Sequence, residues 1–145
     1  MEKENAAQAA AAAPYHQLAK KFGDALMQEK YSEAYALMSD AYRKHTTLEK
    51  FTELHKNARK EYGKPLQVET GVGTLDKDSL KDEEYGKLDE IPANIRRAWM
   101  HAQLALEVSG KGEDAEVDRC YDCWMLLIDQ NGKLVVGRFE YHWCD

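Results

Sequence analysis

The C-terminal part of the chain, residues 120–144, consists of two long runs of strand-forming side chains around a short polar segment. β-Branched and aromatic residues favour strands, and an Asn-Gly pair favours a tight hairpin turn, here within residues 129–132. Three segments with helical periodicity precede this predicted hairpin. The order of helices first and antiparallel sheet second places the chain in the α+β class.

The three predicted helices are defined by apolar spacing and by residues typical of helix ends. The first begins at Pro14, which suits a first helical turn, and carries Tyr15, Leu18, Phe22, Ala25 and Leu26. The second is short and begins after Ser32 as N-cap, with Tyr35, Leu37 and Met38. The third follows Thr46, has Glu49 at capping-box spacing, and carries Phe51, Leu54, Ala58 and Tyr62 before Gly63 and Pro65 end it.

Two further strands are expected between the helices and the hairpin. From Leu66 the apolar period changes to two, although Gly71 and Gly73 weaken the far end of this strand. Residues 76–94 are charged and turn-rich, which predicts a loop with a helical turn before Ile95. Residues 100–108 alternate between apolar and polar side chains, as a half-buried strand does. The sheet therefore has four strands or more, and we expect it to be curved.

Side chains of the predicted hairpin alternate between two faces. One face carries Tyr121, Cys123, Met125, Leu127, Val135, Phe139, Tyr141 and Trp143, and Gly137 leaves a gap in it. The other face carries Trp124, Leu126, Ile128, Leu134 and Val136 near the turn. Since both faces are apolar there, both need cover. The helices cover one face, and a symmetric homodimer is our preferred cover for the other.

Composition limits the size, the partners and the location of the protein. A chain of 145 residues suits one domain, which we assign to residues 14–145, after a flexible Ala-rich tail at residues 1–13. The net charge of −6 argues against nucleic acid and against an anionic membrane surface. No apolar run is long enough for a membrane span, and no signal peptide is recognisable. The expected location is cytoplasmic, or exported if the tail follows a removed signal.

Two stretches of the sequence resemble the nuclear transport factor 2-like superfamily. Residues 27–43 (MQEKYSEAYALMSDAYR) with residues 47–51 (TLEKF) are similar to its short second helix and the start of its third helix. Residues 124–139 (WMLLIDQNGKLVVGRF) are similar to its closing hairpin. The resemblance covers nearly everything after Pro14 and implies a cone-shaped, cystatin-like α+β fold.

This superfamily includes ketosteroid isomerases, polyketide cyclases, dehydratases, transport adaptors, immunity accessory proteins and many binding modules without chemistry. Its fold therefore leaves function open. Its enzymes use an acidic or His/Asp base within the cone, often with a tyrosine donor. No position of this sequence matches those motifs residue by residue.

The residues themselves suggest two sets of site candidates. The weak catalytic candidates are His101, Asp122 and His142, as bases beside Tyr121 or Tyr141, although a solvated face with cross-strand charge pairs explains them more simply. The ligand-binding candidates are Trp99, Tyr121, Phe139, Tyr141 and Trp143, which would line the mouth of a pocket. For these rings the competing interpretation is that they fill the core.

The three cysteines do not indicate a metal site. Cys120 and Cys123 have CxxC spacing, but in a strand their thiols point to opposite faces, which is unsuitable for zinc or for a redox pair. Cys120 and Cys144 lie on the same side across the hairpin and are a candidate disulfide, with two reduced thiols as the alternative. We expect no metal and no cofactor.

These observations lead to three functional hypotheses. The first is a non-catalytic binding module that presents a cone pocket or a sheet face to a protein or to a small apolar ligand. The second is a small cone-pocket enzyme of the isomerase or cyclase type. The third is an inhibitor or immunity protein, in which acidic charge complements a basic toxin.

Overall fold

The computed structural model of the chain describes residues 2–75, 80, 91–110, 113 and 116–144, with side chains from residue 11 onward. Helices α1 (Glu2–Met27), α2 (Tyr31–Ala36), α3 (Asp40–His45) and α4 (Leu48–Tyr62) precede the sheet. The strands are β1 (Gln67–Thr74), β2 (Arg96–Ser109), β3 (Glu116–Gln130) and β4 (Lys133–Trp143), with a short 3₁₀ turn, η2 (Ala93–Ile95), before β2.

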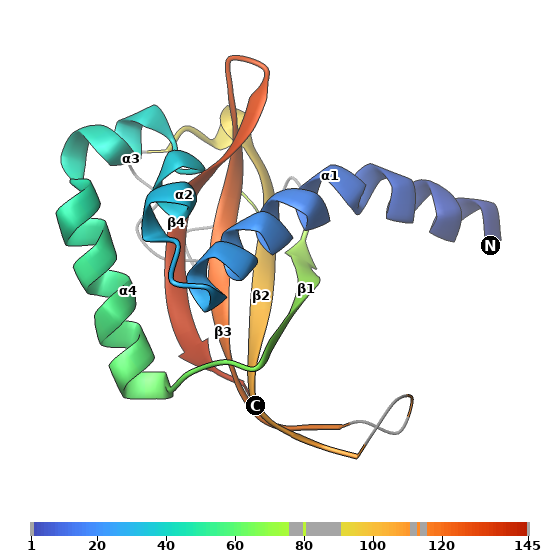
Figure 1. Cartoon of the computed structure of the whole chain (residues 1–145). Coiled ribbons are helices and arrows are strands. Elements are labelled where there is room, and N and C mark those ends of the chain that lie inside the picture. Colours follow the sequence, from blue (N-terminus) through green and yellow to red (C-terminus); the bar gives the residue numbers. More distant parts are fainter. Residues whose placement is uncertain (1, 76–79, 81–90, 111–112, 114–115, 145) are drawn as a thin grey trace.

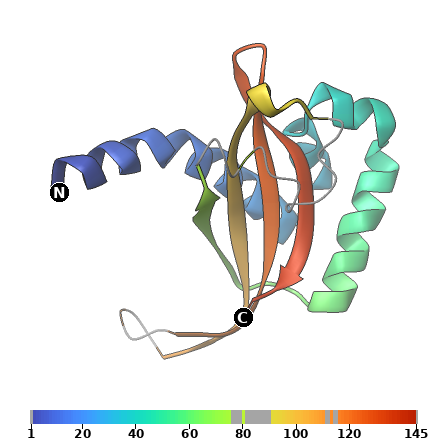
Figure 2. The ribbon, with the colours of Figure 1, turned by 180° about the vertical axis from the view of Figure 1, so that it is seen from behind.

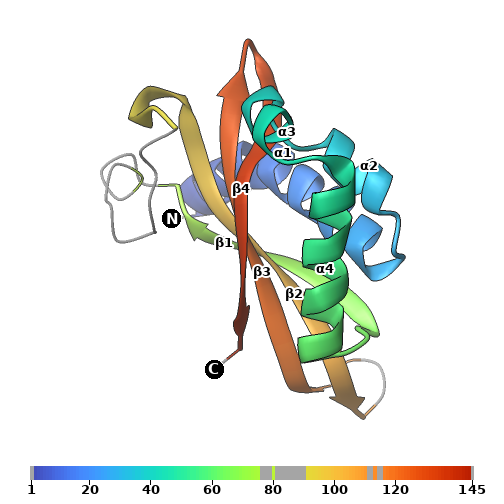
Figure 3. The ribbon, with the colours of Figure 1, turned by 90° about the vertical axis from the view of Figure 1, so that its left-hand side faces the viewer.

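The four strands form one open antiparallel sheet in the order β1-β2-β3-β4. All four helices lie on one side of this sheet, while η2 lies toward the other side (Figures 1 and 3). The prediction of an α+β fold with helices before an antiparallel sheet is confirmed. The described helices number four rather than three. Among the described residues, no helix is both long enough and apolar enough to cross a membrane.

Helix α1 begins at Glu2 and contains Pro14, whereas we expected it to begin at Pro14. The alanines before Pro14 explain the earlier start, because alanine has the highest helix propensity. From Pro14 onward the helix buries Leu18, Phe22, Ala25 and Leu26, as the periodicity indicated, and Tyr15 is partly buried. The mobility of residues 1–13 stays a prediction.

Gly23 brings α1 close to the sheet. A Cβ atom at this position would lie 2.8 Å from Cγ1 of Val68 and 3.0 Å from Cβ of Ala102. Both neighbours resist displacement, since Val68 is β-branched and the Cβ of Ala102 is fixed by the β2 backbone. The glycine therefore sets the distance between the helix layer and the sheet.

We expect Gly23→Ala to lower the free energy of unfolding by about 1–2 kcal/mol. Overpacking a core costs about 1–3 kcal/mol, which outweighs a gain of at most about 1 kcal/mol in helix propensity. Chemical denaturation of the purified variant measures this. In a Val68→Ala background the same change should cost clearly less, because one of the two clashes is gone. An equal cost in both backgrounds would show that Val68 does not limit the approach of α1.

The region between α1 and α4 differs from the prediction in one respect. We expected one short helix capped by Ser32, but Ser32 lies inside α2, and a second short helix, α3, follows. Ser39 caps α3, and its hydroxyl accepts a hydrogen bond of 3.2 Å from the backbone N–H of Tyr42. Ser39 is buried, and its own N–H donates to the carbonyl of Val136 in β4. This contact with a distant strand is invisible in local sequence.

Helix α4 follows the prediction closely. Its N-cap is Thr47 rather than Thr46, and the Thr47 hydroxyl accepts from the N–H of Lys50 at 3.2 Å. The helix ends at Gly63, whose φ of 121° is a conformation that favours glycine. The residues at its two ends therefore specify where the helix begins and where it stops.

The β3–β4 hairpin turns at Asn131 and Gly132, whose φ values of 53° and 86° suit a two-residue hairpin turn. Between Leu126 and Leu127 the register shifts, so that Leu126 faces Arg138 and Leu127 faces Val136. Gly137 is the extra residue at this bulge. A hairpin with residues 129–132 as its turn is expected to pair Leu126 with Val136, but the observed turn at Asn131 and Gly132 pairs Val136 with Leu127, so the expected register is already wrong by one residue before the bulge.

The bulge also changes which side chains of β4 face the helices. Val136 packs in the main core together with Phe139 and Tyr141, whereas Val135 lies on the opposite face. We had placed Val135 with the rings and Val136 opposite them. One inserted residue reverses the alternation along a strand, so the predicted faces of β4 hold only beyond Gly137, whereas those of β3 hold from Tyr121 to Ile128.

Figure 2 shows the ribbon from the face of the sheet away from the helices. This face carries a second apolar cluster. Its buried members are Leu80, Trp99, Leu126, Ile128 and Val135, with Ile91, Ile95 and Trp124 packed against them. Arg96 holds the covering residues, because its guanidinium donates to the carbonyls of Leu80 and Ile91 at 2.6 Å each. Residues of the chain itself thus cover part of this face. A homodimer that covers the face stays a prediction.

Candidate functional site

The space between the helices and the sheet is filled by aromatic rings. The centroids of Phe51 and His55 are 4.3 Å apart, and those of His55 and Phe139 are 4.5 Å apart. Phe22 packs against the same three rings at 6.0–6.4 Å. These contacts agree with the interpretation in which Phe139 belongs to the core.

His55 forms a buried polar contact within this aromatic cluster. Its Nδ1 lies 2.5 Å from the hydroxyl oxygen of Tyr141, and 2% of the residue is exposed. Its Nε2 and the hydroxyl of Tyr31 are buried and have no hydrogen-bond partner among the described residues. Burial lowers the pKa of His55 from 6.5 to about 3 and raises the pKa of Tyr141 well above 10. Both groups are therefore neutral near pH 7.

The predicted buried stripe of α4, which includes Leu54 and leaves out His55, is wrong at this position. We had placed Leu54 on the buried stripe of α4, but Leu54 is 41% exposed and His55 takes the core position. Residues 51, 55, 58 and 62 follow the i, i+4, i+7, i+11 spacing at least as well as the set with Leu54. Spacing alone could have found His55, and the greater hydrophobicity of leucine misled the assignment.

The predicted pocket residues separate into two groups. Tyr121, Phe139 and Tyr141 lie on the helix side of the sheet, and Trp143 lies at its end, 44% exposed, with its ring 4.8 Å from that of Tyr62. Trp99 is 1% exposed and lies on the opposite face. It cannot line a cavity together with the other four.

The predicted catalytic candidates lie on the face of the sheet away from the helices. Asp122 and His142 are cross-strand neighbours there. His101 packs its ring against Trp124 with centroids 4.7 Å apart, over the space that Gly71 leaves open. The sheet separates these three groups from the hydroxyls of Tyr121 and Tyr141, so they do not form the proposed acid–base pairs. The described residues contain no cluster of His, Cys, Asp and Glu suited to a metal ion.

Cys120 and Cys144 are joined by a disulfide bond, with their Cα atoms 5.5 Å apart. The backbone N–H of Cys144 donates to the carbonyl of Cys120 at 3.3 Å, so the bond joins Cys120 of β3 to the opposite residue, which directly follows β4. Cys123 is free and fully buried, and burial raises the pKa of its thiol well above its usual range. This thiol is therefore protonated and unsuited to nucleophilic chemistry.

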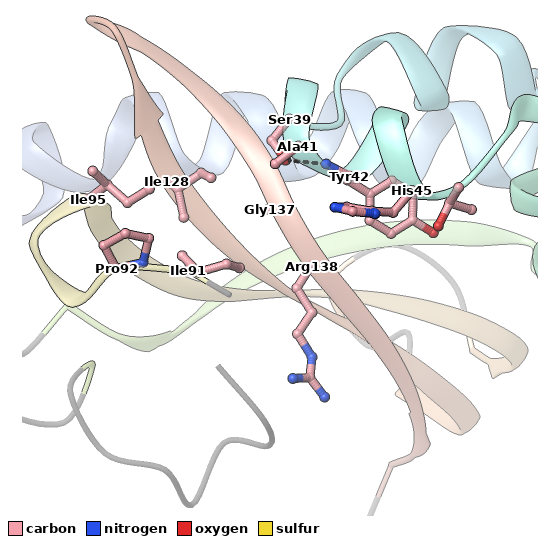
Figure 4. Close-up of a pocket in the computed structure, with 11 residues that line it drawn as sticks. Ser39, Ala41, Tyr42, His45, Ile91, Pro92, Ile95, Ile128, Gly137 and Arg138 are labelled. Atoms are coloured by element: carbon pink, nitrogen blue, oxygen red, sulfur yellow. Dashed lines mark hydrogen bonds between the residues drawn. The ribbon is translucent and has the colours of Figure 1, made fainter. Parts of the chain in front are cut away.

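An open groove of about 580 Å³ lies where β4 passes between α3 and the segment around η2 (Figure 4). One wall carries Ile91, Pro92, Ile95 and Ile128, and the other carries Ser39, Ala41, Tyr42, His45 and Thr46. Gly137 lies between the walls, and Arg138 extends from the next position of β4.

The isoleucine wall packs directly onto Gly137. A Cβ atom at Gly137 would lie 3.0 Å from Cδ1 of Ile128 and 3.2 Å from Cδ1 of Ile91, so a larger residue here would displace the isoleucines of that wall. We predicted a gap at Gly137 in the ring-bearing face, but the missing side chain would point toward Ile128 and Ile91 on the opposite face, and the groove was not predicted. Its walls come from three segments that are distant in sequence, and α3 was not expected at all.

Comparisons with protein-family models, with curated proteins and with solved structures found no match to this chain. The function therefore has to be argued from the geometry.

Proposed function

We propose that the protein is a non-catalytic binding module of the nuclear transport factor 2-like type, and that the groove at Gly137 binds a small, largely apolar ligand. The support is the groove itself, which has the size and the mostly apolar walls of small-molecule sites. An antiparallel sheet with helices on one face is compatible with that superfamily. That this sheet has the cone shape of the superfamily is part of the proposal.

The enzyme alternative has one observation in its favour, the buried contact between His55 and Tyr141. An imidazole beside a tyrosine is the pair that such an enzyme needs. However, His55 is almost completely enclosed, and a base with a pKa near 3 accepts protons poorly at neutral pH. The inhibitor alternative is supported only by the net charge of −6. Binding is therefore the function that we favour.

The groove can be tested with two matched substitutions of exposed alanines. Ala41 lies on α3 and lines the groove, whereas Ala36 lies on α2 outside it. We expect Ala41→Trp to block the groove and Ala36→Trp to leave it open, with both variants folded. The measurement is the change in amide chemical shifts during titration with a set of small apolar compounds.

Saturable shifts should centre on Tyr42, Ile128 and Gly137 in the native protein and in Ala36→Trp, and should be lost in Ala41→Trp. Shifts centred on the opposite face near His101 and Trp124 would overturn the assignment of the groove. Binding that is equal in all three proteins would overturn it as well.

A further inference from the structure

We propose that the disulfide between Cys120 and Cys144 is a redox-operated latch on the end of β4, and that its reduction by a dithiol makes the buried thiol of Cys123 accessible. The latch lies apart from the groove at Gly137 and does not depend on the proposed binding function. Three features of this sheet edge support it: the position of the bond, the side chain that the end of β4 covers, and the exposure of the three cysteines.

The bond holds the free end of an edge strand. β4 is the last strand of the sheet, and its neighbour within the sheet is β3. Cys144 directly follows Trp143, the last residue of β4, and its backbone N–H donates to the carbonyl of Cys120. The covalent bond therefore lies where an edge strand would begin to separate from its neighbour.

Burial contributes little to holding this end in place. The side chain of His142 is exposed, and Trp143 is 44% exposed. The ring of Trp143 packs against Tyr62, and the guanidinium of Arg119 lies 5.2 Å from its centroid. Ring contacts and cation–π contacts at exposed sites are weak interactions. The disulfide is therefore the strongest constraint on residues 142–144.

The end of β4 covers Cys123 from the edge of the sheet. Tyr141 is the cross-strand partner of Cys123, and both side chains pack in the core on the helix side. Cys123 is 0% exposed, and the hydroxyl of Tyr141 is bonded to His55 within the same core. When residues 141–144 separate from β3, the thiol loses the ring beside it and faces solvent from this edge.

The exposure of the cysteines fits this order of events. Cys120 and Cys144 are partly exposed, so a dithiol can reach their bond, whereas Cys123 is buried. One thiolate of the dithiol attacks a sulfur of the bond, and its second thiol resolves the mixed disulfide. Cys120 and Cys144 each gain one electron and one proton, and the dithiol becomes a cyclic disulfide. Oxidised glutathione restores the bond and leaves as two molecules of reduced glutathione.

The test measures the rate at which N-ethylmaleimide labels Cys123 in the full chain, with peptide mapping by mass spectrometry to separate the three cysteines. Dithiothreitol reduces the protein and is removed before labelling. We expect Cys123 to be labelled about 100-fold faster after reduction, because a cross-link of this span restricts the opening of the chain by about that factor. Reoxidation with oxidised glutathione should restore the slow rate.

Urea separates opening of the latch from unfolding of the whole protein. In the reduced protein the labelling rate of Cys123 should be nearly independent of urea at low concentrations, because opening the end of one strand exposes little surface. A rate that increases exponentially from the lowest urea concentration would show that Cys123 is reached only through global unfolding. That result would overturn the latch.

Ala98→Cys combined with Cys123→Ala is the matched control. Ala98 is 0% exposed and lies in the same core as Cys123, but next to Leu127 near the other end of the sheet. Its thiol should be labelled slowly in both redox states at low urea. Equal acceleration of the two thiols by reduction would contradict the proposal, and so would labelling of Cys123 that is equally fast before reduction.

Hydrogen exchange makes the same comparison without any substitution. Reduction of the native protein should accelerate amide exchange at residues 140–144 and leave residues 98–104 of β2 unchanged. Unchanged exchange at residues 140–144 would show that the end of β4 stays closed without the bond, and the disulfide would then be no latch.

Discussion

Lowering the pH from 7 to 5 should reduce the free energy of unfolding by about 2 kcal/mol through His55 alone. Its pKa is about 3 in the folded protein, because burial disfavours the charged imidazole, against 6.5 for an exposed histidine. At pH 5 the unfolded chain therefore binds a proton at His55, whereas the folded protein does not. This contribution to stability is fully present above pH 6.5, decreases as the pH falls below that value, and reaches a loss on the order of 5 kcal/mol below pH 3.

The matched variant is the double substitution His55→Phe and Tyr141→Phe. It removes the titrating ring and also the hydroxyl that would otherwise lose its partner, which is why it should cost less than either single change. The surrounding rings of Phe22, Phe51 and Phe139 can accept a phenyl group. Urea denaturation at pH 7 and pH 5 should show a much smaller pH dependence in the double variant.

Tyr141→Phe alone separates the effect of burial on the pH dependence from the effect of the hydrogen bond between His55 and Tyr141. It should keep the pH dependence, because His55 remains buried, although it lowers stability at pH 7 by about 1–3 kcal/mol by leaving Nδ1 unpaired. If the native protein and the double variant lose the same stability between pH 7 and pH 5, His55 is not held neutral inside the fold.

The parts of the fold that follow from sequence are those specified by neighbouring residues. Helix α4 has a capping threonine at one end and Gly63 at the other, and the hairpin turn has Asn131 and Gly132. Each of these signals acts within a few residues, so reading the chain locally is sufficient. The α+β order follows because periodicity changes from helical to alternating after Pro65.

The parts that do not follow depend on contacts between distant segments. Ser39 caps α3 and also pairs with Val136, and Gly137 forms a bulge that turns Val135 away from the core. An inserted residue leaves no mark in a pattern of alternating side chains when both faces of the strand are apolar. The walls of the groove come from segments around α3, η2 and Ile128 that are distant in sequence, so the groove could not be predicted as a site.

His55 illustrates a different limit. The helical spacing permits Leu54 or His55 on the buried stripe, and hydrophobicity favours leucine. The structure instead buries the imidazole, which shares a hydrogen bond with Tyr141 from the far end of the chain. A buried histidine is acceptable because its partner arrives through the tertiary fold, and that partner cannot be identified from α4 alone.

Replacing Cys120 and Cys144 by alanine should lower the free energy of unfolding by about 3 kcal/mol. The bond links residues with a sequence separation of 24, and a cross-link of this span restricts the unfolded chain by roughly that amount. It also closes the open end of the hairpin, where β4 is the last strand of the sheet and the rings of Tyr62 and Trp143 pack against each other. Without the bond, this end should open before the rest of the sheet.

Urea denaturation with and without a thiol reductant measures the contribution of the bond. Reductant should destabilise the native protein to the level of the double alanine variant and should leave that variant unchanged. Cys123→Ala is the control, because Cys123 is a free buried thiol, and its response to reductant should match that of the native protein. Intact mass under thiol-blocking conditions should show the loss of two hydrogen atoms in the native protein. Two blocked thiols at positions 120 and 144, with no effect of reductant on stability, would show that the hairpin holds its end by packing and hydrogen bonds alone.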